Sequence, residues 1–232
     1  MFGEKSNQMR YFNFLFNFLN TWLKAIGINS KRTKLAIYNL PRFLYECKIY
    51  NRKIVKASQK AKKFPLKITQ LKPCLNDYNS EAGTYGAYFF QDLWAAKVIY
   101  KKGPLEHIDI GSRIDGFISH LLIFTKVIAI DIRPLESKVE GLKFLQSDAT
   151  YLDIFADNSV DSISSLHVAE HFGLGRYGDD LDPEACFIFM KNLQRVLAKN
   201  GTLLFSVPIG IDSLYFNANR KFNPQTILSS FD

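Results

Sequence analysis

Short runs rich in apolar residues recur along the chain after residue 100, and each has the length of a buried β-strand. The predicted strands are residues 105–110, 127–130, 142–146, 160–166 and 202–207. Stretches with helical periodicity precede or separate them at residues 89–101, 114–124 and 187–197. Asn200-Gly201 is expected to end the last helix, because glycine readily takes a left-handed C-terminal cap. Strands that alternate with helices are typical of a parallel sheet covered on both faces, so the pattern predicts an α/β domain.

A glycine turn joins the first predicted strand to the helix after it. The strand ends at Gly111, and the next strand ends on Asp131. This is the βαβ unit of nucleotide-binding folds, in which the glycine lets the backbone approach a ligand and the carboxylate accepts hydrogen bonds from ribose. A dinucleotide site carries G-x-G-x-x-G, whereas here Arg113 replaces the second glycine and only Gly116 keeps the third. A long side chain there obstructs a pyrophosphate, so the turn disfavours NAD and suits a ligand without phosphates, such as S-adenosylmethionine (SAM).

The motifs downstream follow the order found in SAM-dependent methyltransferases. Ser147-Asp148-Ala149 follows the third strand, and R-V-L-A-K-N-G-T-L-L-F-S-V-P, ending at Pro208, resembles the R-V-L-K-P-G-G region of these enzymes. Between Tyr88 and Leu228 lie D-I-G-S-R-I-D-G-F, D-I-R-P-L, S-S-L-H-V-A-E-H-F-G-L-G-R-Y-G-D and F-N-P-Q-T-I. Together these strings resemble the methyltransferase-like family called domain of unknown function 268.

The resemblance implies a Rossmann-like class I methyltransferase sheet, mostly parallel and flanked by helices, that binds SAM. Members often accompany surface-polysaccharide biosynthesis genes, which implies a small-molecule or lipid-linked glycan acceptor. The residues expected to bind the cofactor lie around the glycine turn and the ends of the next strands. They are Asp109, Gly111, Ser112, Arg113, Gly116, Asp131, Ile132, Asp148, Ala149 and Leu166.

The segment after the fourth strand, H-V-A-E-H, carries the candidate catalytic residues. Methyltransferases place groups beside the transferred methyl at this position. A hydroxyl acceptor must lose its proton, and histidine is suited to accept it near neutral pH. His171 is the preferred base, His167 the second candidate, and Glu170 would orient them. Alternatively, His167 caps the strand and Glu170 pairs with Arg176 or Arg195.

The spacing H-x-x-E-H is also found in zinc metallopeptidases. That chemistry needs both histidines on one helical face and a further ligand. A strand runs straight into His167, and Gly173 and Gly175 end any helix after one turn. The context therefore disfavours zinc, and no metal is expected.

Residues for the acceptor are expected in three places. Arg176 and Tyr177 lie in a glycine-rich loop, and Arg220 follows the fifth strand, where guanidinium groups could hold a phosphate or carboxylate. Gln91 and Asp92, on the predicted helix before the first strand, could touch SAM or acceptor. A solvated helix face explains the last two equally well.

The first third of the chain has a different pattern. Residues 11–26 place asparagines and Lys24 at helical spacing and leave a broad aromatic and aliphatic face, which predicts an amphipathic helix. Residues 31–63 predict one or two basic helices, broken or kinked near Pro41. Prolines and asparagines mark a join before residue 79. The expected organisation is a basic helical extension, 1–75, and a methyltransferase-like domain, 76–232.

Charge separates the same two parts. Residues 1–76 hold 16 Lys and Arg and 2 acidic residues, a net charge of +14, whereas the rest holds 14 and 20, a net charge of −6. An arm packed on its own domain, or on a second subunit in a homodimer, is the simplest explanation. The functional alternative is peripheral contact with an anionic membrane. Nucleic acid would explain the charge equally, but no DNA or RNA motif is present, and the aromatics lie on a different face from the charge.

Other features bear on location. Cys47, Cys74 and Cys186 are widely spaced without C-x-x-C, which indicates reduced thiols in a cytoplasmic protein. No run reaches the roughly 18 apolar residues of a membrane span. Polar residues interrupt the apolar N-terminal stretch, which disfavours a signal peptide. The expected location is the cytoplasm, with peripheral attachment at the inner membrane face as an extension.

A class I methyltransferase normally adds an antiparallel hairpin at the edge of the sheet, and these last strands are expected to be missing from this chain. The sequence therefore predicts a SAM-dependent methyltransferase that O-methylates a sugar or lipid-linked glycan. The alternative is a non-catalytic Rossmann-like binding or assembly module of a polysaccharide machinery. SAM binding separates the two.

Overall fold

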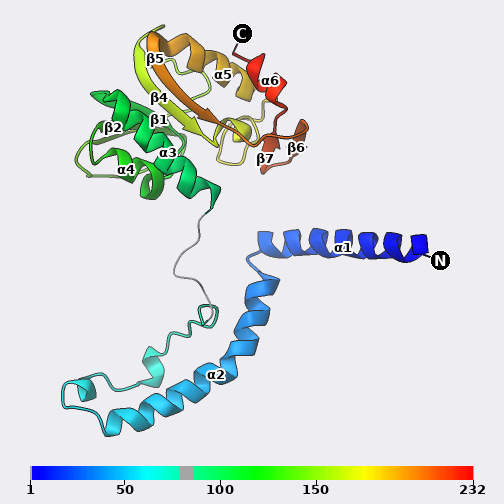
Figure 1. Ribbon diagram of the computed structural model, residues 1–232, viewed down its shortest axis with the longest axis vertical. Coiled ribbons are helices and arrows are strands. Elements are labelled where there is room, and N and C mark those ends of the chain that lie inside the picture. The colour runs from blue at the N-terminus through cyan, green and yellow to red at the C-terminus, as the bar shows by residue number, and fades with distance from the viewer. Residues whose placement is uncertain (1, 79–85, 232) are drawn as a thin grey trace. The chain divides into compact units, whose positions relative to one another are not determined.

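The computed structural model describes residues 2–78 and 86–231, with side chains from residue 13 onward (Figure 1). Contacts within the chain divide it into two units, Met1–Thr84 and Tyr85–Asp232. The predicted boundary after residue 75 lies inside the first unit. In the described residues, no helix is long and apolar enough to cross a membrane.

The first unit is built on two long helices. They are α1 (Phe2–Ala25) and α2 (Ser30–Val55), followed by short 3-10 turns at Ala61–Lys63 and Ile68–Gln70. Asn29 caps α2 by accepting a hydrogen bond from Arg32 N at 3.1 Å. Pro41 lies inside α2 without ending it, but the helix stops at Val55 rather than near residue 63 as predicted.

Buried polar contacts hold the following segment to α2. Asn39 is buried and donates from Nδ2 to Leu75 O at 2.8 Å. Tyr78 donates from Oη to Glu46 Oε2 at 2.8 Å, and its ring stacks under Arg42, whose guanidinium carbon lies 4.1 Å from the ring centroid. The segment that follows the two 3-10 turns therefore folds back onto α2.

The second unit contains a five-stranded parallel sheet with the order β3-β2-β1-β4-β5. The strands are β1 (Glu106–Ile110), β2 (Lys126–Asp131), β3 (Leu142–Gln146), β4 (Val160–Leu166) and β5 (Leu197–Ser206). β1 and β4 are buried over nearly their whole length, as expected of central strands covered on both faces. The predicted Rossmann-like sheet is confirmed.

Helices cover both faces of the sheet (Figure 1). α3 (Ala87–Lys102) and the short α4 (Ser119–Leu121) lie on one face, and α5 (Ala185–Val196) lies on the other. The first core cluster includes Ile99, Leu121 and Val127; the second includes Ile163 and Phe189. β2 and β4 contribute apolar side chains to both cores, as expected of strands covered on both faces.

Two predicted helical features are wrong. The stretch 114–124 was expected to be one helix, but it consists of a π-type turn (Ile114–Ile118) and the single turn of α4. Inside the π-type turn Gly116 has φ −113° and ψ −108°, which is not helical. Asn200-Gly201 does not cap α5, because the helix ends at Val196 and β5 begins at once.

Gly201 instead lies in a bulge of β5. The pairing with β4 passes from Val160 opposite Leu197 to Ser162 opposite Thr202, so β5 carries extra residues. A Cβ on Gly201 would lie 2.8 Å from Val160 O. The glycine is required by this close approach rather than by a helix cap.

The chain after β5 forms a second, two-stranded antiparallel sheet from β6 (Ser213–Tyr215) and β7 (Asn219–Lys221). This small hairpin was not predicted, and it does not extend the main sheet. α6 (Pro224–Leu228) follows, with Asn223 as its N-cap accepting from Gln225 N at 3.0 Å. Asn223-Pro224 therefore opens this helix, with Asn223 as the cap and Pro224 as the first helical residue.

Candidate functional site

The sheet has one topological switch point, between β1 and β4. From β1 the chain moves outward to β2 and β3, and it then returns to place β4 on the other side of β1. In open α/β sheets, ligands bind outside the carboxyl ends of the strands at such a point. The residues that follow β1 and β4 are therefore the first candidates for a functional site.

The turn after β1 requires glycine. Gly111 has φ +72°, a left-handed conformation that favours glycine, and its N–H donates to Ile130 O at 2.8 Å. A Cβ on Gly111 would lie 2.6 Å from Val168 Cγ1. The turn after β1 is therefore packed directly against the segment after β4, which carries the histidines.

Asp109, on β1, holds this turn through hydrogen bonds. It is fully buried, and its carboxylate accepts hydrogen bonds from Ser112 N (3.1 Å), Ser112 Oγ (3.0 Å) and Ser164 Oγ (2.5 Å). Burial raises the pKa of Asp109 to about 6, and the serine hydrogen bonds oppose that rise. Asp109 and Ser112, both predicted to contact the cofactor, thus bind each other and fix the shape of the turn.

Asp109 belongs to a buried polar cluster that the sequence analysis missed. His107 Nδ1 lies 2.7 Å from Ser162 Oγ, and its Nε2 lies 2.8 Å from Ser164 Oγ. Burial lowers the pKa of His107 to about 3, so the ring is neutral inside the fold. Ser162 and Ser164 could have indicated this cluster, because they are polar residues at alternate positions of the buried strand β4.

Arg113 does not occupy the ligand side of the turn. Its guanidinium makes two hydrogen bonds to Asp115, at 3.0 and 2.7 Å, and its side chain is 82% exposed. The side chain that the sequence analysis considered an obstacle therefore points into solvent. Gly116 lies near α3, where a Cβ would come within 3.3 Å of Asp92 Oδ2.

Asp131 ends β2 as predicted, but its carboxylate already has a partner. Arg133 donates to Asp131 Oδ1 from its backbone N (2.8 Å) and Nε (2.9 Å), and Nη2 lies 2.5 Å from Oδ2. The Arg133 guanidinium carbon also lies 4.7 Å from the centroid of the Tyr177 ring. Arg133 was not among the predicted site residues, although a basic residue two positions after Asp131 could have indicated an ion pair. Ile132 contributes its carbonyl oxygen, which accepts from Gln146 Nε2 at 3.1 Å.

The remaining predicted cofactor residues follow β3 and end β4. Asp148 Oδ1 accepts from Thr150 N at 2.8 Å and from Thr150 Oγ1 at 2.6 Å, which forms a tight turn. Ala149 and Leu166 are buried, one in each hydrophobic core. Their side chains pack inside the domain, so only their backbone groups are available to a ligand.

The histidines after β4 lie beside a buried carboxylate. His167 Nδ1 lies 3.1 Å from Glu170 Oε1, and His171 Nε2 lies 3.9 Å from the same oxygen. Glu170 is 2% exposed, and its Oε2 has no hydrogen-bond partner within the described residues. His167 has φ +58°, and its ring meets Tyr88 edge-on at 5.3 Å between centroids. This backbone conformation, rare outside glycine, turns the chain so that His167 and Glu170 meet.

Among the described residues no arginine pairs with Glu170, so the expected pairing with Arg176 or Arg195 is wrong. Arg195 donates to Asp157 Oδ1 at 2.7 Å and to the carbonyls of Tyr151, Leu152 and Phe155. Arg176 donates to Ala218 O at 3.0 Å. The carboxylate of Glu170 is therefore left to the two histidines.

The loop between β6 and β7 meets the predicted acceptor residues. Ala218 O accepts from His171 Nδ1 at 2.6 Å as well as from Arg176. Arg220 Nη1 donates to Phe172 O at 2.6 Å. The Tyr177 ring lies beside both the His171 ring, at 5.7 Å, and the Arg176 guanidinium, at 5.0 Å. The structure thus brings these predicted catalytic and acceptor residues together, although more than 40 positions separate Ala218 from His171 and Arg176.

The side chains of Gln91 and Asp92 point toward the sheet rather than into solvent. Ser206, at the carboxyl end of β5, donates from Oγ to Gln91 Oε1 at 2.9 Å. Burial raises the pKa of Asp92, and the nearby His120 opposes that rise. Both side chains are half-buried at the edge of the sheet where β1, β4 and β5 end.

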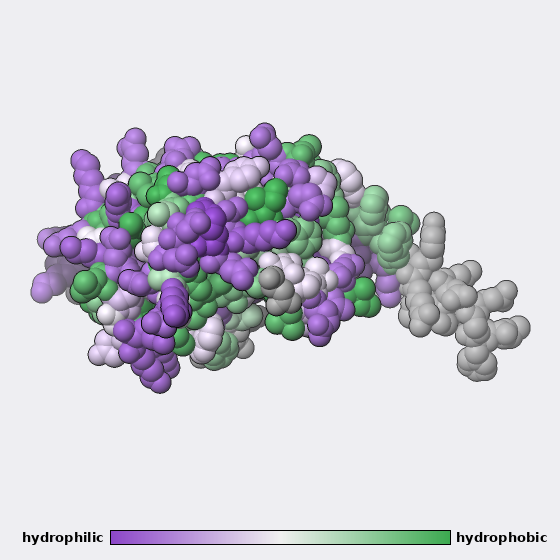
Figure 2. All heavy atoms as spheres, turned by 90° about the horizontal axis from the view of Figure 1, so that it is seen from above, coloured by the Kyte–Doolittle hydropathy of each residue, from purple (hydrophilic) through white to green (hydrophobic). Residues whose placement is uncertain are grey.

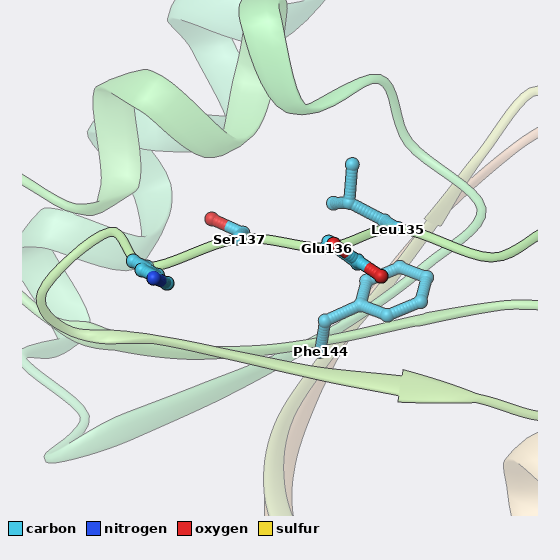
Figure 3. A pocket seen from close by; sticks show the side chains of 5 residues that line it. Leu135, Glu136, Ser137 and Phe144 are labelled. Atoms are coloured by element: carbon cyan, nitrogen blue, oxygen red, sulfur yellow. The ribbon is translucent and has the colours of Figure 1, made fainter.

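A surface cavity lies elsewhere, between the segment after β2 and the edge strand β3 (Figure 3). Leu135, Glu136 and Ser137 line one side of it, and Phe144 of β3 forms the base. None of the predicted site residues lines this cavity. The cavity therefore does not account for the cluster at the switch point.

Comparison with known proteins agrees with the predicted resemblance over part of the chain. Residues 125–228 match the family described as Caenorhabditis protein of unknown function, DUF268. The match includes β2, the histidine segment and the hairpin, and it begins after the glycine turn. Comparison with curated proteins gives no match.

Several solved structures are similar to this chain. The 1,6-didemethyltoxoflavin-N1-methyltransferase of Burkholderia thailandensis, with bound S-adenosylhomocysteine, is 16% identical with a TM-score of 0.47, covering 61% of this chain and 65% of that one. The [4+2]-cyclase SpnF is 15% identical with a TM-score of 0.48, and the match covers 66% of this chain and 59% of SpnF. The sugar N-methyltransferase KedS8 from Streptoalloteichus is 13% identical with a TM-score of 0.41, and the match covers 58% of this chain and 62% of KedS8. This chain spans less than two thirds of each structure's length, and likeness at such identities concerns the fold alone.

Proposed function

We propose that this protein is a SAM-dependent methyltransferase that O-methylates a sugar or lipid-linked glycan in the cytoplasm. One observation carries the proposal. Val168 packs against Gly111, which brings the glycine turn after β1 and the His167–Glu170 pair after β4 to the same switch point. A nucleoside-binding turn beside a histidine held by a buried carboxylate suits transfer to a hydroxyl.

The residues around the turn fit a nucleoside without phosphates. Gly111 carries no side chain on the turn, and Arg113 lies in solvent with Asp115. Asp131 stands at the end of β2, where a ribose would be held. When bound, SAM would supply an activated methyl group, with a thioether as the leaving group. Positioning by the turn and by Asp131 would therefore contribute much of the catalysis.

The proton of the acceptor hydroxyl is assigned to His167. With its Nδ1–H donated to Glu170 Oε1, His167 has Nε2 available as the proton acceptor. Glu170 orients the ring and stabilises the imidazolium that forms, as the carboxylate of a catalytic triad does. With its proton on His167, the acceptor oxygen would be free to bond to the methyl carbon while the thioether leaves. The geometry favours His167 over His171, the base preferred from sequence.

His171 is given a different role. Its Nδ1 must carry a proton to donate to Ala218 O, so this histidine is tied to the β6–β7 loop. Arg176 donates to the same oxygen, and Arg220 donates to a carbonyl rather than to a carboxylate. The two guanidinium groups therefore retain positive charge near the histidines. This supports an acceptor that carries phosphate, such as a sugar nucleotide or a lipid-linked sugar phosphate.

A non-catalytic binding module is the second candidate. The observation that favours it is the Asp131–Arg133 ion pair, which occupies the carboxylate that a ribose would need. For SAM to bind, Asp131 must share its oxygens with the ribose or release Arg133. The module hypothesis predicts a folded protein without affinity for SAM.

The test is methyl transfer from radiolabelled SAM to sugar nucleotides and lipid-linked sugar phosphates. His167→Gln should lower turnover by about 10²–10⁴-fold, the usual contribution of a general base, and leave the affinity for SAM unchanged. His171→Gln should mainly raise the KM for the acceptor. Full activity of the His167 variant, together with an inactive His171 variant, would reverse the two roles.

A further inference from the structure

The first unit exposes an aromatic surface that its own fold does not cover. Phe14, Phe18 and Trp22 follow one another along α1 at a spacing of four residues, with ring centroids 6.4 and 6.1 Å apart. They are 66%, 51% and 63% exposed. Figure 2 shows green apolar surface on the described part of α1, toward the right of the view. A monomeric soluble protein rarely exposes a continuous apolar patch of this kind without a partner for it.

The helix is amphipathic, and residues 13–25, whose side chains are described, include no acidic residue. Leu15, Leu19 and Ile26 extend the aromatic row into a broad apolar face, and all are exposed. Asn17 and Lys24 lie on the opposite side. This is the pattern of a helix that lies in the plane of a membrane interface, where aromatic rings are favoured.

The charge of the unit identifies the kind of membrane. Residues 5–45 contain no aspartate or glutamate, and residues 1–84 hold 16 Lys and Arg against 4 acidic residues, a net charge of +12. One of those acids, Glu46, is already bonded to Arg42 and Tyr78. Such a surface is attracted to anionic headgroups, by roughly 1 kcal/mol for each cation near the lipid.

α2 repeats the combination of exposed apolar and basic side chains. Ile37, Leu44 and Tyr45 are large exposed apolar residues, and Lys34 and Lys48 are exposed on the same helix. A second copy of the chain would oppose one strongly basic surface with another. Charge therefore favours lipid over self-association as the partner of this surface.

We propose that the first unit binds anionic lipid bilayers peripherally, with the Phe14–Phe18–Trp22 row of α1 inserted among the headgroups and the lysines of α2 on the lipid phosphates. The proposal is independent of methyl transfer, since it rests on residues of the first unit alone. An enzyme anchored in this way would work on acceptors that are themselves in the membrane.

The experiment uses the full chain with Trp94→Phe, which leaves Trp22 as the one tryptophan of the two in the sequence. Vesicles of phosphatidylcholine with 30% phosphatidylserine, about one third anionic lipid, should shift the Trp22 emission to shorter wavelength and sediment the protein. Phosphatidylcholine alone should do neither. Phe14→Ser combined with Phe18→Ser should weaken binding at least about tenfold. Lys34→Glu should weaken it about fivefold or more, and high salt should weaken it as well.

Ile123→Ser is the matched control, because Ile123 is an exposed apolar residue of the second unit. It should leave vesicle binding unchanged. No binding to anionic vesicles, or equal binding to both vesicle types, would overturn the proposal. Reversible dimerisation that the Phe14 and Phe18 substitutions abolish, without any vesicle binding, would overturn it in favour of a second copy of the chain.

Discussion

The two units of this protein use apolar residues in opposite ways. In the second unit, large apolar side chains such as Phe189 and Ile99 are fully buried in two cores on the faces of a parallel sheet. In the first unit, Phe18, Trp22 and their neighbours are exposed along helices. Similar apolar content therefore stabilises a fold in one unit and remains available for a partner in the other. Burial, rather than composition, distinguishes a structural phenylalanine from a functional one.

Matched phenylalanine substitutions would show this difference most strongly. Phe189 is fully buried and stacks on Phe172 with ring centroids 4.2 Å apart, so Phe189→Ala should lower the free energy of unfolding by about 3–5 kcal/mol. Phe18→Ala should change it by less than about 0.5 kcal/mol, because that ring is half exposed. Urea denaturation followed by circular dichroism measures both values. Equal losses would mean that Phe18 is buried in the folded protein.

The glycine turn provides a second, smaller effect within the second unit. Gly111→Ala should lower the free energy of unfolding by about 2–3 kcal/mol, because the new Cβ meets Val168 and φ is positive. Combining it with Val168→Ala should restore about half of that loss, since the clash is removed while the backbone strain remains. Failure of the second substitution to restore any stability would show that Val168 does not pack on the turn.

The buried pair His107 and Asp109 should give opposite pH dependences. Burial lowers the pKa of His107 to about 3, so the unfolded state binds a proton that the folded state refuses, and stability falls as pH drops below about 6.5. Burial raises the pKa of Asp109 to about 6, so the folded state binds a proton more tightly, and stability rises as pH drops from 6 toward 4. The two contributions partly cancel in the native protein.

Removing Asp109 should expose the histidine contribution. As pH falls from 6 to 4, the free energy of unfolding of the Asp109→Asn variant should decrease by about 2 kcal/mol more than that of the native protein. Denaturation midpoints measured across that interval test this expectation. Parallel pH profiles for the two proteins would mean that Asp109 is charged throughout.

The smallest effect is expected at an exposed ion pair. Arg113→Ala removes two hydrogen bonds to Asp115, but both side chains are exposed, so the free energy of unfolding should change by less than about 0.5 kcal/mol. SAM affinity should also be unchanged if Arg113 lies outside the turn as the structure shows. A clear loss of SAM affinity in calorimetry would return Arg113 to the site.

The sequence predicted the sheet well and the contacts between its loops poorly. The strands 142–146 and 160–166 were predicted with the bounds that the structure gives, because their pattern and flanking turns are local signals. The helix predicted at 114–124 failed at Gly116, whose backbone is not helical, because apolar periodicity does not report the conformation of a single glycine. The β6–β7 hairpin was missed because its strands are three residues long.

The candidate site shows the same limit. The places of Gly111 in the turn after β1 and of Asp131 at the end of β2 were predicted from a motif, since both depend on the backbone near them. The links from His171 and Arg176 to Ala218 join residues more than 40 positions apart, and no local pattern encodes them. Likewise, the pairing of Asp131 with Arg133 depends on side-chain direction at the end of β2, which the spacing alone does not determine.

The central claim is that the switch point between β1 and β4 binds SAM. Calorimetric titration of the purified full chain with SAM, and separately with NAD, tests it most directly. The account predicts micromolar affinity for SAM, an affinity at least about tenfold lower in Asp131→Ala from the loss of hydrogen bonds to a charged group, and no response to NAD. A folded chain that binds NAD, or that binds neither compound, would contradict it.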